Sequence, residues 1–78
     1  MELQHSHNVN ELFQQLGLDD SDGAVDKFIS RHQLRRDDGE LYRAIFWTPA
    51  QAKFIKEAVE QDADWAEAVD ELDARLRR

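Results

Sequence analysis

A helix start at Thr48 is the strongest structural signal in this sequence. Threonine can cap a helix, Pro49 suits the first helical position because its missing N–H would have no partner there, and Gln51 can reach back to the cap amide. Apolar residues then recur at helical spacing as far as about Gln61. The sequence therefore predicts a helix from Pro49 to about Gln61, around which the rest of the fold must be built.

The first half of the chain carries the boundaries of two shorter helices. Asn8 and Glu11 form a capping pair, and Gly17 supplies a left-handed stop to the helix that follows them. The side-chain oxygens of residues 19–22 can accept hydrogen bonds from the exposed amides at the start of a second helix, which runs to about Gln33. We expect these two helices to form a helical hairpin.

A second capping pair, Asp64 with Glu67, predicts a last helix that runs to the end of the chain. Whether this helix continues the one that starts at Pro49 stays open, and we favour a bend near residues 62–64. The last two helices would then form a second hairpin.

Together these segments predict one all-α domain over residues 1–78, a small irregular bundle of about four helices. It consists of two helical hairpins joined by an ordered loop, with residues 1–7 as a flexible tail. The expected core takes apolar side chains from all four helices: Leu12, Phe13, Leu16, Phe28, Ile29, Phe54, Ile55, Val59, Trp65, Val69 and Leu72. The chain has no cysteine, so apolar packing has to hold the fold without disulfides or thiolate metal sites.

Charge and hydropathy narrow the classes of partner. Acidic residues outnumber basic ones by 17 to 10, for a net charge of −7, which disfavours nucleic acid and anionic lipid. The polar first ten residues do not look like a signal peptide, and no apolar run approaches membrane-spanning length. We expect a cytoplasmic protein with no membrane contact.

The charges are unevenly placed. Every charged residue from Glu57 to Asp73 is acidic, which indicates a solvated helix face or, less simply, a surface offered to a basic partner. Arg75 and Arg77 follow this run, where they can pair with Glu71 and Asp73 one turn earlier.

The ordered loop holds the candidate interaction surface. Leu41, Tyr42, Ile45, Phe46 and Trp47 are more apolar than a short surface connection requires. In one reading they form a strap across the open end of the core. In the other, part of the segment stays exposed and binds a protein partner or a second copy of the chain.

The histidines offer little evidence of a chemical site. His5 and His7 near Glu2 could contact a metal, but their spacing on a tail is poor for one, and we expect none. His32 lies on the apolar stripe of its helix and is expected to be partly buried with one hydrogen bond.

Ser21, between Asp20 and Asp22, is similar to the attachment serine of acyl carrier proteins. An apolar residue follows the serine in those proteins, whereas Asp22 and Gly23 follow it here, and helix capping accounts for the same residues more simply. We expect neither catalytic residues nor a cofactor.

Three blocks of the sequence resemble a known family. They are residues 11–18 (ELFQQLGL), 46–52 (FWTPAQA), and 62–67 (DADWAE) leading to 72–76 (LDARL). In this order they are similar to the short, mostly proteobacterial proteins called domain of unknown function 2789, over nearly the whole chain. The resemblance implies a similar size and helical character, and it implies no substrate, cofactor or catalytic residue.

The function predicted from these observations is a non-enzymatic helical module that binds another protein or itself. The alternative is a carrier of a small ligand or acyl group with a cavity among its helices. An enzyme is the third choice.

Overall fold

The computed structural model describes residues 7–35, 37–61 and 63–77. In these ranges the chain forms four α-helices and no strand, which confirms the all-α prediction. The elements are α1 (Val9–Gln15), α2 (Asp22–Arg31), the short 3-10 helix η1 (Leu41–Arg43), α3 (Pro49–Gln61) and α4 (Ala63–Leu76). None of the described helices is both long enough and apolar enough to cross a membrane.

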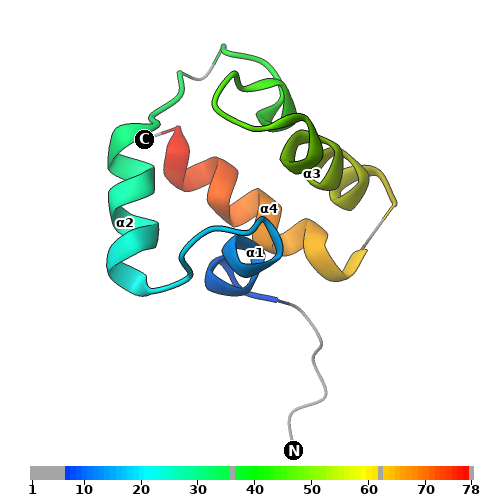
Figure 1. The fold of residues 1–78 in the computed structure, drawn as a ribbon. Coiled ribbons are helices and arrows are strands. Elements are labelled where there is room, and N and C mark those ends of the chain that lie inside the picture. The colour runs from blue at the N-terminus through cyan, green and yellow to red at the C-terminus, as the bar shows by residue number, and fades with distance from the viewer. Residues whose placement is uncertain (1–6, 36, 62, 78) are drawn as a thin grey trace, which may run out of the picture.

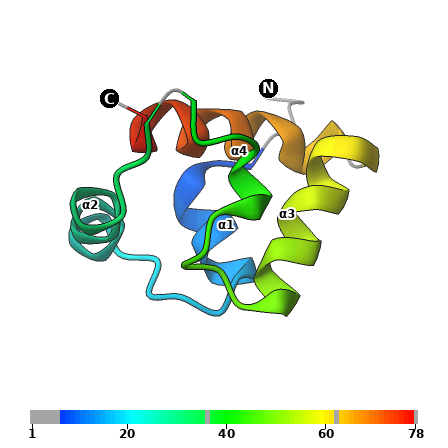
Figure 2. The same ribbon diagram turned by 90° about the horizontal axis from the view of Figure 1, so that it is seen from above.

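The helices pack as an irregular bundle (Figure 1). Helices α1 and α2 contact each other, as do α3 and α4, in keeping with two hairpins. In addition, α1 packs against α4, and η1 packs against α3. Figure 2 shows α2 and α3 on opposite sides of α1, so the segment between them has to span the bundle. That segment carries the candidate interaction surface.

The capping pair of α1 is present as predicted. The Asn8 side chain accepts a hydrogen bond from the Glu11 amide at 2.8 Å, and the Glu11 carboxylate accepts one from the Asn8 amide at 3.0 Å. Gly17 adopts a left-handed φ of 75° after the helix. The Leu18 amide then donates back to the Phe13 carbonyl at 2.9 Å, so the chain reverses and leads to α2.

The capping box of α3 is also confirmed, and its glutamine makes a further hydrogen bond outside the helix. The Gln51 amide donates to Thr48 Oγ1 at 3.1 Å, while Gln51 Oε1 accepts from the Thr48 amide at 3.0 Å. Gln51 Nε2 donates to the Leu16 carbonyl at 2.9 Å. One side chain therefore joins the start of α3 to the end of α1.

Gln51→Glu should destabilise the fold by about 1–2 kcal/mol, because a carboxylate keeps the capping acceptor but loses the donor to the Leu16 carbonyl. This cost should appear although a negative charge suits a helix N-terminus. Urea unfolding followed by circular dichroism measures it. Glu11→Gln, the equivalent change in the capping box of α1, is the matched control. Equal small effects of the two variants would show that the Gln51–Leu16 bond contributes little.

The start of α4 differs from the prediction. The helix begins at Ala63, so Asp64 lies inside its first turn and is not the residue before the helix. The predicted bend is confirmed, because α3 ends at Gln61 and α4 runs in a clearly different direction (Figure 2). Asp62, which the predicted bend includes, is outside the described residues.

The C-terminal end of α4 holds the connection that follows α2. The Leu34 amide donates to the Leu76 carbonyl at 2.7 Å. The Arg77 guanidinium donates to the carbonyl oxygens of Arg35, at 2.7 Å, and Gly39. We call these two Arg77 contacts the C-terminal clasp. They fix Arg35 and Gly39 against a helix end that is some forty residues away along the chain.

Both predicted ion pairs along α4 are present. Arg75 pairs with Glu71 at 2.7 Å, and Arg77 pairs with Asp73. The Arg75 pair is exposed, whereas the Arg77 side chain is only 16% exposed because the clasp covers it. The two pairs therefore look alike in sequence but differ in surroundings.

The core agrees with much of the predicted set and differs at its edges. Its buried members are Val9, Leu12, Phe13, Leu16, Val25, Ile29, Leu41, Trp47, Ile55, Ala58, Ala68, Val69, Leu72 and Leu76. Val59 was predicted in the core and is 45% exposed, because the buried stripe of α3 follows Ile55 and Ala58 instead. Phe28, Phe54 and Trp65 lie at the margin, partly buried.

Candidate binding surface

The strap, residues 41–47, lies against the core with Arg43 and one apolar residue, Ile45, exposed. Leu41 and Trp47 are 4% and 7% exposed, so these two members of the candidate surface are core residues that a partner cannot reach in this conformation. Tyr42 and Phe46 are partly buried. Ile45 is 99% exposed. The accessible part of the candidate surface is therefore the Ile45 side chain with the exposed parts of Tyr42 and Phe46.

Short-range hydrogen bonds within the strap keep Leu41 and Trp47 buried and Ile45 exposed. The Ala44 amide donates to the Leu41 carbonyl at 3.0 Å and closes the turn of η1. The Trp47 indole N–H donates to the same Leu41 carbonyl at 2.9 Å from inside the core. Ile45 lies between these two fixed points, so its outward position follows from the backbone of the strap.

An aromatic cluster around Phe28 joins the strap to α2. The Phe28 ring meets Phe13 and Phe46 edge-on, with centroids 5.1 and 5.7 Å apart. It stacks on Trp47 at 5.5 Å and on His32 at 4.0 Å. Edge-on and stacked contacts of this kind add stability beyond the area that they bury. We refer to these five side chains as the Phe28 cluster.

His32 occupies the C-cap position of α2, one residue past the helix end, which comes slightly earlier than predicted. Its Nδ1 lies 2.8 Å from the Phe28 carbonyl oxygen, so a proton on Nδ1 completes a hydrogen bond there. The ring is partly buried, in agreement with the prediction for this residue. The hydrogen bond and the stacking on Phe28 give His32 a structural role at the end of α2.

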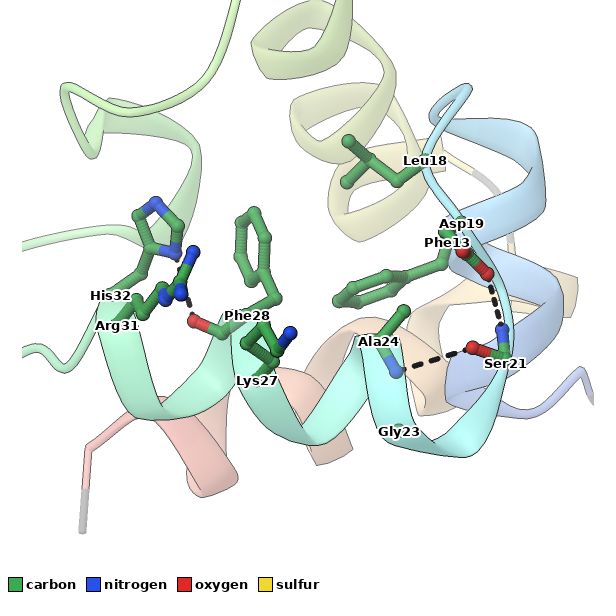
Figure 3. A pocket seen from close by; sticks show the side chains of 10 residues that line it. All are labelled: Phe13, Leu18, Asp19, Ser21, Gly23, Ala24, Lys27, Phe28, Arg31 and His32. Atoms are coloured by element: carbon green, nitrogen blue, oxygen red, sulfur yellow. Dashed lines mark hydrogen bonds between the residues drawn. The ribbon is translucent and has the colours of Figure 1, made fainter.

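A hollow of about 600 Å³ opens beside the Phe28 cluster. Figure 3 shows the rings of Phe13 and Phe28 flanking its floor on α2, with Leu18 on the far side. Lys27 and Arg31, one helical turn apart on α2, also line it. The hollow is open to solvent on one side, and its interior is mainly apolar.

Asp19 and Ser21 form the opposite end of this hollow. The Ser21 hydroxyl caps α2 by accepting from the Ala24 amide at 3.2 Å, and Asp19 accepts from the Ser21 amide at 3.0 Å. Hydrogen bonding of the Asp19 carboxylate to Ser21, first to its amide and then to its side chain, lowers the pKa of the Asp19 carboxyl. The stabilising effect of Asp19 is therefore present above its unfolded pKa and is lost as the pH falls through the lowered folded pKa.

A second hollow, of about 520 Å³, lies between the end of α2 and the strap tip. Its lining includes Ala44, Ile45 and Phe46, and it shares Arg31 and His32 with the first hollow. The two hollows and the Ile45 tip therefore form one continuous surface. We call it the α2–strap surface.

Comparison with known proteins places the chain in a family. A family model described as "Protein of unknown function (DUF2789)" matches residues 1–76. The chain belongs to this family. The match confirms the resemblance seen in the three sequence blocks, and its description assigns no activity. No curated protein and no solved structure matches the chain.

Of the possible metal ligands of this DUF2789 member, His7 is the one that the described residues include. His5 and Glu2 are outside the described residues. His7 belongs to the expected tail, yet its ring stacks on Trp65 with centroids 3.8 Å apart and lies 3.4 Å from the Glu11 carboxylate. Among residues 7–35, 37–61 and 63–77, no group of three or more His, Asp or Glu side chains could hold a metal ion.

Sequence reasoning missed the contribution of α2 to the surface of this family member. The apolar pattern places Phe28 in the core and gives no role to Lys27 or Arg31. A usable signal was present, because residues four apart share a helix face, which puts the two basic side chains together next to the apolar stripe.

Proposed function

We propose that this chain is a cytoplasmic, non-enzymatic module that binds another protein through the α2–strap surface. The observation that carries the proposal is Ile45, which is 99% exposed at the tip of a strap whose other apolar side chains pack on the core. A fully exposed isoleucine contributes nothing to the packing of this fold. It gains a physical role when a partner covers it.

The anchoring of the strap supports this proposal. Trp47 on one side of Ile45 and Leu41 on the other are buried and joined by a hydrogen bond. A side chain presented from a backbone that is already ordered loses less entropy on binding than one on a loose loop. Protein interfaces also favour central apolar and aromatic anchors, and Phe46 with Phe28 supplies aromatic area next to Ile45.

The shape of the hollows favours a protein over a small-molecule ligand. Small-molecule sites usually enclose most of the ligand surface. Both hollows here are open to solvent, so a small acyl chain would stay largely exposed. A protein partner can insert one side chain and cover the opening with the rest of its surface.

Ile45→Asn should abolish partner binding and leave the fold intact. The free energy of unfolding should change by no more than about 0.5 kcal/mol, because the side chain makes no packing contacts to lose. Binding is measured by affinity capture from an extract of the native host, followed by quantitative mass spectrometry of the proteins retained by each variant.

Val59→Asn is the matched control, since Val59 is the other large apolar side chain that is exposed among the described residues and it lies on α3. Proteins that the wild-type chain retains should be lost with Ile45→Asn and kept with Val59→Asn. Retention of the same proteins by both variants would rule out the α2–strap surface as the binding site.

A further inference from the structure

The first hollow carries two positive charges that the fold does not use. Lys27 and Arg31 line it, and neither forms an ion pair within the described part of the chain. Three other cations have partners of opposite charge, Lys53 with Glu57, Arg75 with Glu71 and Arg77 with Asp73, while Arg43 and Lys56 lie over the Tyr42 ring. In a chain of net charge −7, two neighbouring cations without an acidic partner beside an apolar hollow are available to an external anion.

The ends of the hollow differ in charge. Lys27 and Arg31 stand towards the C-terminal end of α2, while Asp19 lies at the N-terminal end (Figure 3). The Ser21 amide keeps Asp19 in its charged form by donating to it. An anionic group is therefore attracted to one end of the hollow and repelled from the other, so a bound segment has a preferred direction.

The same charges argue against a second copy of this chain as the occupant. Two copies that met through their α2–strap surfaces would bring together Lys27, Arg31 and Arg43, which all line this surface. Two carboxylates, those of Asp19 and Asp38, also line it, so the three cations leave an excess of positive charge on the surface of each copy. Like charges facing each other across an interface suppress that pairing.

From these observations we infer that the first hollow receives an apolar side chain from an acidic segment of a different protein, with carboxylates next to the anchor facing Lys27 and Arg31. The anchor packs over Phe28, whose ring already contacts Phe13 edge-on, and faces Leu18 across the hollow. This inference rests on the proposed protein-binding function and adds the chemistry of the partner.

A random peptide display library selected against the full chain tests the inference and does not require the natural partner. The enriched peptides should combine an aromatic or large aliphatic residue with nearby aspartate or glutamate. Their affinity, measured by fluorescence anisotropy, should fall by about tenfold or more for the double variant Lys27→Glu/Arg31→Glu. It should also weaken as salt is added.

Lys53→Glu/Lys56→Glu is the matched control, because it changes the net charge equally but lies on α3. It should leave peptide affinity within about twofold of wild type. If Lys27→Glu/Arg31→Glu alters the circular dichroism spectrum, the neutral pair Lys27→Gln/Arg31→Gln replaces it, with a smaller loss expected.

The outcomes separate this inference from the proposed function. Enriched peptides without acidic residues, equal affinity for both double variants, or no enriched peptides would each overturn the inference. Sedimentation showing a dimer that Ile45→Asn dissociates would also overturn it, by identifying a second copy as the occupant. In each case, capture that depends on Ile45 would leave the proposed function standing, and capture independent of Ile45 would remove it.

Discussion

Trp47→Ala should lower the free energy of unfolding by about 3–5 kcal/mol, the range for removing a large buried aromatic side chain. Trp47 is almost fully buried, stacks on Phe28 and donates its indole N–H to the Leu41 carbonyl. Its removal leaves a cavity between the strap and α2 and takes away one of the two hydrogen bonds that the Leu41 carbonyl accepts. Urea unfolding followed by far-ultraviolet circular dichroism measures the change.

Trp65→Ala is the control for this experiment, because Trp65 is the other tryptophan of the chain. It is partly buried at the edge of the core, where it contacts His7 and Phe54. A loss of about 1–2 kcal/mol is expected, in the ordinary range for a point substitution. Losses of equal size for the two variants would contradict the assignment of Trp47 to the core and of Trp65 to its edge.

Arg77→Met should destabilise the fold by about 2–3 kcal/mol, because hydrogen bonds from a charged group contribute more than neutral ones. The guanidinium donates to the carbonyl oxygens of Arg35 and Gly39 and pairs with Asp73. Methionine keeps much of the aliphatic volume and removes every donor. Native-state hydrogen exchange should show faster exchange of the residue 34 amide, which the end of α4 holds.

Arg75→Met makes the same change two residues away and is the matched control. Arg75 pairs only with Glu71 among the contacts described, and that pair is exposed. Pairs of this kind contribute about 0.3–0.5 kcal/mol. If Arg77→Met costs no more than Arg75→Met, the C-terminal clasp does not hold the loop.

The sequence predicted those parts of the fold that depend on neighbouring residues. The capping pairs at Asn8 and Thr48 and the stop at Gly17 each involve groups within a few residues of one another, and the structure confirms all three. The cap at Asp64 is the exception. Several acidic residues close together offered more than one possible helix start there, and α4 begins at Ala63, before the predicted cap.

Features that depend on distant contacts were not predictable in the same way. Arg77 has the same spacing to an acid as Arg75, and only the packing of α4 near residues 35–39 distinguishes them. Val59 is an apolar residue in a helix, as a core residue would be, but the way α3 packs on the rest of the fold leaves it exposed. Ile45 was included in the candidate surface, whereas its separation from buried Leu41 and Trp47 required the turn of η1.

The double role of Phe28 links recognition to folding stability. Its ring supports Trp47 in the core on one side and borders the first hollow on the other. An occupant of that hollow binds the folded chain and not the unfolded one, so it stabilises the fold by mass action. At a concentration a hundred times its dissociation constant, the free energy of unfolding rises by about 2.7 kcal/mol, and the melting temperature rises with it. Heat resistance in a fractionated extract thus offers a way to search for the natural ligand that requires neither tag nor immobilisation.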